Sequence, residues 1–441
     1  MFNRIKSIIS PSVRITFVNF ALKLVFKFLL LLFVPLYLSS SEMGFWYTFI
    51  SIAALTTFAD LGFTTIITQF SAHEAVKVKF NTATRNFDDS DDKIADISSL
   101  FNFSIKWSGT LTVICSIVIV LIGLFVFGKD NSSNSYWVIP WVIYAIASAL
   151  NFFNQVFLAF FEGCNQIVTS QKIKIVNGLI VNGLGVIGLF FGWGLYALSI
   201  PMLLSVVVSY LQVAMYYGKV ILRMFRCQDN SNNQWAKEIL RLLWKYALSW
   251  GSGYLIFQIY NPLVFSRYGA ETAGQVGYLL TIVGAFVSIA NVWSYVSVPK
   301  INMLTEKKKW NELDFLFNKN IFLIEFTFII EFCACNIARY LPYIGIFVNK
   351  YIFSFPAFLI LSIGYAVQLA ISYIGVYLRS HKEEPLMVSS IITAIISVCV
   401  TVFCLYALPL DWIFGGFTTS VIVMLPVVLR IKKTKCQLWH Q

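Results

Sequence analysis

Long apolar stretches alternate with short polar connections along the whole chain of 441 residues. A helix needs about 20 apolar residues to cross the hydrocarbon core of a bilayer. The stretch 173–218 is too long for one helix, and Gly192-Trp193-Gly194 is expected to divide it, because paired glycines favour a turn. The pattern predicts twelve membrane-spanning helices, over residues 15–38, 45–70, 103–127, 136–160, 175–192, 195–217, 243–266, 275–299, 320–340, 354–378, 387–407 and 412–429.

The composition agrees with membrane spans and excludes a soluble core. Hydrophobic residues make up 58% of the chain and charged residues only 12%. The core of a soluble domain could not bury the apolar surface of so many hydrophobic residues. The predicted fold class is an all-α polytopic membrane protein.

The two halves of the chain share one arrangement of helices and loops. A tight loop at 40–44 (Ser-Ser-Glu-Met-Gly) leads into the second predicted helix, and 270–274 (Ala-Glu-Thr-Ala-Gly) leads into the eighth. Because six crossings is an even number, the two repeats are expected to run parallel. The predicted organisation is an N-terminal lobe (1–218), a basic linker (219–241) and a C-terminal lobe (242–441), with a cavity between the lobes.

The distribution of lysine and arginine predicts the orientation of the helices. With the N-terminus in the cytoplasm, 27 of the 33 lie on the inner side, four on the outer side and two within the first helix. This bias places both termini in the cytoplasm by the positive-inside rule. The net charge of +12 is therefore expected to face anionic membrane lipids, not nucleic acid. The one sizeable inner loop, 71–102, is expected to be a solvated linker with an interfacial helix.

The sequence shows no pattern typical of an enzyme or a metal protein. Its eight cysteines lack metal-ligand spacing and are interpreted as reduced packing residues. There is no nucleophile–base constellation and no glycine-rich nucleotide loop, and the predicted outer loops are short. We expect a transporter that needs no metal or cofactor.

Several motifs, in their order and spacing, resemble the Wzx-type polysaccharide (O-antigen) flippases of the multidrug/oligosaccharidyl-lipid/polysaccharide exporter superfamily. The resemblance covers essentially the whole chain. It is carried by Glu-Met-Gly-Phe-Trp at 42–46, Phe-Ala-Asp-Leu-Gly at 58–62, Phe-Glu-Gly-Cys-Asn-Gln at 161–166, Ala-Gly-Gln-Val-Gly-Tyr at 273–278 and Val-Pro-Lys at 298–300.

The resemblance implies a V-shaped, two-lobed transporter that alternates between inward and outward openings. Its implied substrate is an undecaprenyl-diphosphate-linked oligosaccharide, which is moved to the outer leaflet of the bacterial inner membrane. Polymerase and chain-length proteins are its expected protein partners. The nearest rival is a multidrug or cation antiporter of the same superfamily. A membrane polysaccharide polymerase is a more distant alternative.

Two lysines in the first predicted helix are the strongest candidates for a binding role. Lys23 and Lys27 are one turn apart on the same helix face, about 13 and 20 Å beyond Arg14 at 1.5 Å per residue. A cation at this depth costs about 2.5–3.5 kcal/mol on insertion scales, so both should face protein or water. They either line a path for the carrier's diphosphate or pair with Asp60 in the second helix.

Other charged residues have weaker but similar claims. Arg14 and Lys245 either collect headgroup phosphates or only reach the interface as helix-end cations. Glu331, near the midplane of the ninth helix, is either a coupling carboxylate or a structural ion-pair partner. Glu325 lies about 240° from it around the helix, so the two cannot face one lumen.

Uncharged polar residues in two helices are candidates for sugar contacts. More often such residues form hydrogen bonds between helices, which contribute only about 0.6 kcal/mol each on average. The candidates are Asn151, Asn154, Gln155, Gln258 and Asn261.

Overall fold

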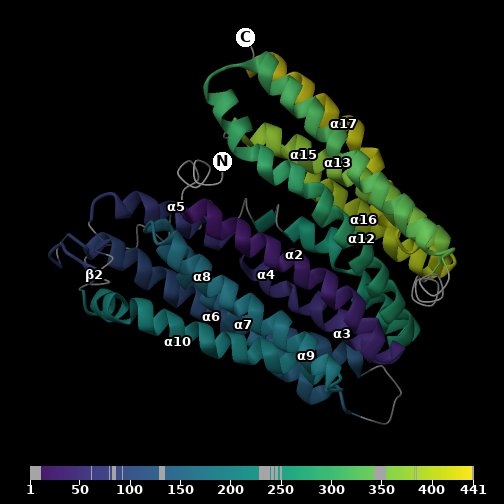
Figure 1. Ribbon diagram of the computed structural model, residues 1–441, viewed down its shortest axis with the longest axis horizontal. Coiled ribbons are helices and arrows are strands. Elements are labelled where there is room, and N and C mark those ends of the chain that lie inside the picture. The colour runs from purple at the N-terminus through teal and green to yellow at the C-terminus, as the bar shows by residue number, and fades with distance from the viewer. Residues whose placement is uncertain are drawn as a thin grey trace. The chain divides into compact units, whose positions relative to one another are not determined.

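The computed structural model describes residues 11–60, 62–78, 80–81, 86–91, 93–128, 135–227, 239, 243, 247–248, 251–341, 354–381, 383 and 385–439. Nearly all regular structure in these ranges is helical, so the chain is an all-α polytopic membrane protein as predicted. It divides into two compact units, Met1–Trp250 and Gly251–Gln441 (Figure 1).

The first unit contains six predicted crossings, some of them built from more than one helix. The second crossing consists of α3, α4 and α5, and the fifth consists of α8, a π-helical turn and α9. The elements are α2 (Pro11–Tyr37), α3 (Ser40–Ala53), α4 (Leu55–Asp60), α5 (Phe63–Ala75), α6 (Ala95–Phe127), α7 (Val138–Gly163), α8 (Ile167–Gly178), η1 (Leu179–Gly183), α9 (Leu184–Phe190) and α10 (Tyr196–Arg226).

The second unit is built from long helices. The longest of them, α12 (Tyr260–Glu306), contains Gly269, whose φ of 82° and ψ of −179° interrupt the helical path between the predicted crossings 243–266 and 275–299. The elements are α12 (Tyr260–Glu306), α13 (Trp310–Ala338), α15 (Phe355–Arg379), α16 (Met387–Ala407), the short 3₁₀-helix η2 (Leu410–Trp412) and α17 (Gly415–Trp439).

Ten helical segments among the described residues are long and apolar enough to cross a membrane. Breaks in the helices explain why two of the twelve predicted crossings are not among these ten: one crossing is divided into shorter helices, and two others are joined in one long segment. Gly62, with φ of 76°, separates α4 from α5, and Gly269 divides the 56-residue segment Gly251–Glu306. The predicted break between the fifth and sixth crossings is confirmed: Gly192 and Gly194 both have positive φ, 74° and 55°, which glycine adopts at little cost.

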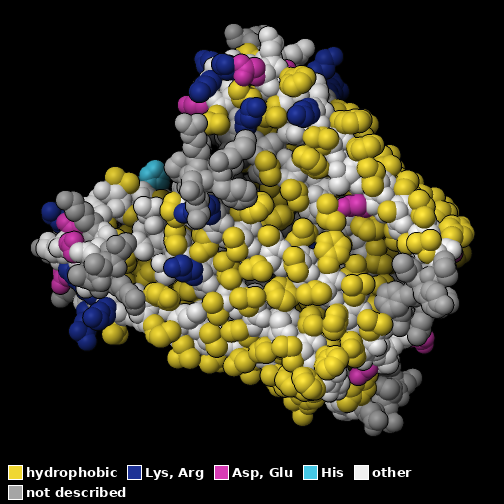
Figure 2. Space-filling view, in the orientation of Figure 1, with side chains coloured by type: hydrophobic (Ala, Val, Ile, Leu, Met, Phe, Trp, Pro, Cys, Tyr) yellow, Lys and Arg dark blue, Asp and Glu magenta, His cyan; other side chains and the backbone are white. Residues whose placement is uncertain are grey.

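Apolar side chains cover much of the outer surface of the helices in the view of Figure 2. On α6, side chains spaced by four residues form an exposed apolar stripe, as on a helix that faces lipid. The stripe consists of Val113, Ile117, Leu121 and Phe125, which are 55–70% exposed. Inside the unit, aromatic rings pack closely, for example Phe161 and Tyr217, stacked with centroids 3.7 Å apart.

The loop that follows α5 contains a short hairpin where an interfacial helix was expected. Its described strands, β1 (Phe80–Asn81) and β2 (Asn86–Phe87), pair antiparallel. Arg223 of α10 holds the loop in place: its guanidinium donates to Asp91 at 2.8 Å and to the carbonyls of Phe87 and Asp89, both at 2.6 Å. The loop is therefore attached to the end of the sixth crossing.

Candidate functional site

A polar cavity of about 330 Å³ lies within the first unit, between α4–α5 on one side and α7–α8 on the other. Polar groups at membrane depth are expensive and usually serve structure or transport. Two carboxylates, one lysine and several hydroxyl and amide groups face this cavity. Its lining consists of Thr56, Asp60, Thr64, Thr65, Thr68, Asn151, Phe152, Gln155, Ala159, Glu162 and Lys174.

Asp60 lies on the side of the cavity that α4 and α5 form, which is lined by threonines. The helix breaks at Gly62, and the Asp60 carboxylate accepts hydrogen bonds from the Thr64 backbone N–H at 3.0 Å and the Thr64 hydroxyl at 2.8 Å. It therefore caps the start of α5, satisfying an N–H that has no partner within the helix. Asp60 is only 7% exposed, and it forms no ion pair with the other residues that the structure describes.

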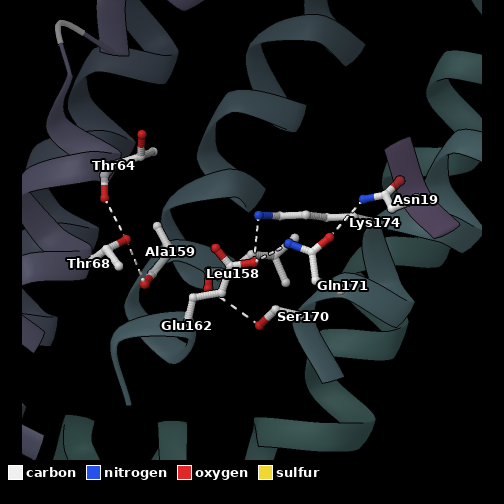
Figure 3. A network of polar contacts seen from close by, with 9 residues as sticks. All are labelled: Asn19, Thr64, Thr68, Leu158, Ala159, Glu162, Ser170, Gln171 and Lys174. Carbon is white, nitrogen blue, oxygen red and sulfur yellow. Dashed lines mark hydrogen bonds and ion pairs between the residues drawn. The ribbon is translucent and has the colours of Figure 1, made fainter. Parts of the chain in front are cut away.

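An ion pair forms the opposite side. The Lys174 ammonium lies 2.7 Å from Glu162 Oε1, and Gln171 Nε2 donates to the same oxygen at 3.1 Å. Asn19 of α2 donates to Gln171 Oε1 at 2.8 Å. Figure 3 shows Lys174 and Gln171 both pointing to Glu162, with Asn19 beyond Gln171.

The turn between α7 and α8 creates this ion pair. Asn165 takes a left-handed conformation with φ of 62°, which asparagine tolerates better than most residues. The Gln166 N–H then donates to the Phe161 carbonyl at 2.9 Å. This tight turn folds α8 back along α7, so that Glu162 and Lys174, twelve residues apart, come into contact.

The lysines of α2 lie along α8. Asn19, Lys23 and Lys27 are spaced by four residues and share one face of α2, and Asn19 is bonded to α8. The two helices run in the same direction, since Tyr37 near the end of α2 contacts Phe190 at the end of α9. Lys23 is therefore level with Lys174, and it interacts electrostatically with the Glu162–Lys174 pair.

The predicted sugar-contact residues of α7 divide between two faces. Asn151 and Gln155 line the cavity, and Asn151 Oδ1 accepts from Asn177 Nδ2 at 3.5 Å. Asn154 is fully buried on another face and donates to Ser209 of α10 at 2.6 Å. For Asn154 the structure thus shows a hydrogen bond between helices.

Asn154→Ala is expected to lower the free energy of unfolding by about 0.6 kcal/mol, the typical value of a hydrogen bond between membrane helices. Thermal unfolding in detergent measures the effect. Gln155→Ala is the matched control one residue away, because its side chain lines the cavity and should leave the melting temperature nearly unchanged. Equal melting temperatures for Asn154→Ala and the wild type would contradict the interhelical role.

The remaining predicted residues that the structure describes do not line this cavity. Arg14 is exposed near the start of α2, and Lys245 lies outside the described residues. Gln258 sits in the turn before α12, whereas Asn261 is buried in its first turn. Glu325 and Glu331 are half-buried on α13 of the second unit, and neither forms an ion pair among the described residues.

Sequence reasoning did not select Lys174, Glu162 or the threonines as site residues. A signal for the threonine side was present, because Thr56, Asp60, Thr64 and Thr68 recur every four residues, as on one face of a helix. The Glu162–Lys174 pair carried a weaker signal. Glu162 lies in the motif at 161–166, but the motif gave no indication of its partner.

Comparisons with known proteins identify the fold. No protein-family model matches the chain, and no curated protein matches it. Among solved structures, the lipid II flippase MurJ in an inward closed conformation matches with a TM-score of 0.60 at 14% identity, covering 96% of this chain and 87% of that one. An inward-facing multidrug resistance MATE family transporter of the MOP superfamily gives 0.59 at 14% identity, covering 94% and 98%.

A third structure is a MOP superfamily transporter from Pyrococcus furiosus with a reverse-polarity binding pocket. Its TM-score is 0.56 at 15% identity, with 98% of this chain and 96% of that one covered. At these identities the likeness concerns the fold. The chain therefore has the fold that these MOP superfamily transporters share.

Proposed function

We propose that this protein is a flippase of the MOP superfamily that moves undecaprenyl-diphosphate-linked oligosaccharides across the bacterial inner membrane by alternating access. The oligosaccharides are repeat units for O-antigen, capsule or exopolysaccharide, and both termini of the protein lie in the cytoplasm. The observation that carries the proposal is the row of cations on α2, Lys23 and Lys27, beside a polar cavity that holds a third cation, Lys174.

The two parts of the substrate need different chemistry, and both kinds are present. A diphosphate is recognised by cations, and lysine supplies a compact point charge for phosphate. Sugar hydroxyls both donate and accept hydrogen bonds, as amide side chains do. Asn151 and Gln155 present such amides to the cavity, so we assign them to sugar contact.

The membrane potential favours transport in the proposed direction. When an anion moves from a negative interior to the outside, its free energy falls by about 2.3 kcal/mol per charge per 100 mV of membrane potential. Basic residues that travel with the anion reduce this gain, whereas fixed residues do not. Coupling to an ion gradient is therefore not required on energetic grounds.

A multidrug or cation antiporter is the second candidate, because MATE transporters share the fold. Cationic drugs would favour acidic residues in the path, and Asp60 and Glu162 line the cavity. The lysines on α2 favour an anionic substrate. The charge of the transported molecule thus separates the two functions.

The function is tested by locating lipid-linked oligosaccharide in a strain that lacks the protein. Spheroplasts are probed with an impermeant lectin, and total lipid extracts are measured by mass spectrometry. We expect the oligosaccharide to accumulate and to bind lectin only after lysis. Accumulation on the outer face would point to a polymerase or ligase. Absence of accumulation would favour the drug antiporter.

A further inference from the structure

Glu162 is the carboxylate that pairs with the Lys174 ammonium at the wall of the cavity. Its Oε1 accepts from Lys174 at 2.7 Å and from Gln171 at 3.1 Å. Both charged side chains line the cavity and are partly accessible, with 22% of Lys174 and 18% of Glu162 exposed. An anion that enters the cavity can therefore reach both members of the pair.

We propose that the diphosphate of the lipid carrier binds to Lys174 together with Lys23 by displacing Glu162, which acts as an internal competitor for the cation. This inference rests on the proposed flippase function and adds the site that holds the carrier's charged group. No covalent bond changes: one phosphate oxygen replaces one carboxylate oxygen at the ammonium.

The arrangement of α2 and α8 supports a shared site for both lysines. Asn19 and Gln171 bond across the two helices at 2.8 Å (Figure 3). Lys23 lies one turn after Asn19, and Lys174 lies three residues after Gln171, so both cations follow in the same direction along the paired faces. Lys23 is repelled by Lys174 and attracted by Glu162. A dianionic group between the two ammonium groups would relieve that repulsion.

The displaced carboxylate keeps a partner. Gln171 donates to Glu162 independently of Lys174, and Asn19 fixes the orientation of the Gln171 amide. A buried carboxylate without any donor would be costly, so this second bond lowers the cost of exchange. The same carboxylate is then ready to recapture Lys174, which favours release of the diphosphate at the end of a transport step.

Binding measurements on the purified full-length protein in detergent test the exchange. The probe is farnesyl diphosphate, and farnesol is the uncharged reference. We expect the isosteric variant Glu162→Gln to bind farnesyl diphosphate about fivefold more tightly, which corresponds to removing a competing ion pair of about 1 kcal/mol. Lys174→Ala is expected to weaken binding by a similar factor. In the Lys174→Ala background, Glu162→Gln should have little further effect.

Asp60→Asn is the matched control, because Asp60 is a carboxylate of the same cavity that caps a helix and pairs with no described lysine. Equal tightening by Asp60→Asn and Glu162→Gln would show general repulsion and overturn the exchange. Unchanged affinity of Glu162→Gln would also overturn it, while wild-type binding of farnesyl diphosphate above farnesol would leave the flippase proposal intact. If the wild type does not distinguish the two probes, the proposed function itself fails.

A competition experiment identifies the source of the phosphate group. Phosphatidylglycerol added in mixed micelles should displace farnesyl diphosphate weakly, because its single negative charge engages one ammonium rather than two. Displacement at equal concentration would overturn the assignment to the lipid carrier and indicate a site for ordinary headgroups. The melting temperature and the elution volume of each variant confirm that it is folded.

Discussion

Replacing Lys23 and Lys27 together with alanine is expected to abolish polymer export while the protein stays in the membrane. Both side chains lie on the face of α2 that bonds to α8, so the double variant removes two of the three cations beside the cavity. Insertion should improve, because each lysine costs about 2.5–3.5 kcal/mol at a helix centre. Loss of export in this variant would thus reflect loss of substrate binding.

The amount of surface polysaccharide measures export, and an immunoblot of the membrane fraction measures the protein. Lys23→Arg with Lys27→Arg is the control, because it keeps both charges and should retain a substantial part of the export. Arg14→Ala, at an exposed position near the start of α2, should have a smaller effect than the double lysine variant. Normal export by the double alanine variant would refute a role for these cations in transport.

Gly163→Val is expected to prevent accumulation of folded protein. A Cβ at Gly163 would lie 1.8 Å from Ser71 Oγ and 2.5 Å from the Thr68 carbonyl oxygen. The hydroxyl can rotate, but the carbonyl belongs to the backbone of α5, so α5 and α7 would have to separate. Overpacking of this kind typically costs about 1–3 kcal/mol even for small additions, and valine adds two further methyl groups.

The separation would also break the bond from Thr68 Oγ1 to the Ala159 carbonyl, 3.1 Å in length, at the wall of the cavity. Yield and melting temperature after purification in detergent measure the effect. Gly218→Ala in α10 is the control, because a Cβ there meets nothing within 4 Å and alanine favours the helix by up to about 1 kcal/mol. If Gly163→Val has the same melting temperature as the wild type, α5 and α7 do not pack as closely at Gly163 as the structure shows.

The crossings were predictable because hydropathy reports directly on the environment that a membrane helix requires. The first helix was expected over 15–38 and is found at Pro11–Tyr37. The breaks within a crossing were harder to predict. Gly192 and Gly194 stand together and indicate a turn, whereas Gly62 is a single glycine in an apolar stretch. What ends α4 there is a backbone conformation and a cap from Asp60, which hydropathy does not register.

Part of the candidate site follows from the spacing of residues along a helix, and part depends on backbone conformations that the spacing does not reveal. The common face of Lys23 and Lys27 follows from their spacing of four residues. The partner of Glu162 does not follow from spacing, because the left-handed conformation at Asn165 determines which residues of α8 return to it. Asp60 illustrates a different difficulty: a carboxylate in a membrane helix suggests an ion pair, but a neighbouring N–H satisfies it here.

The π-helical turn at Leu179–Gly183 changes the relation between the two ends of the fifth crossing. Such a turn accommodates one extra residue within an α-helix, and one residue corresponds to a rotation of about 100°. Before it, α8 presents Gln171 to α2; after it, α9 brings Gly185 and Gly188 against Ala197 of α10. In an alignment with relatives that lack this turn, a one-residue gap within 179–183 is needed to keep both faces in register.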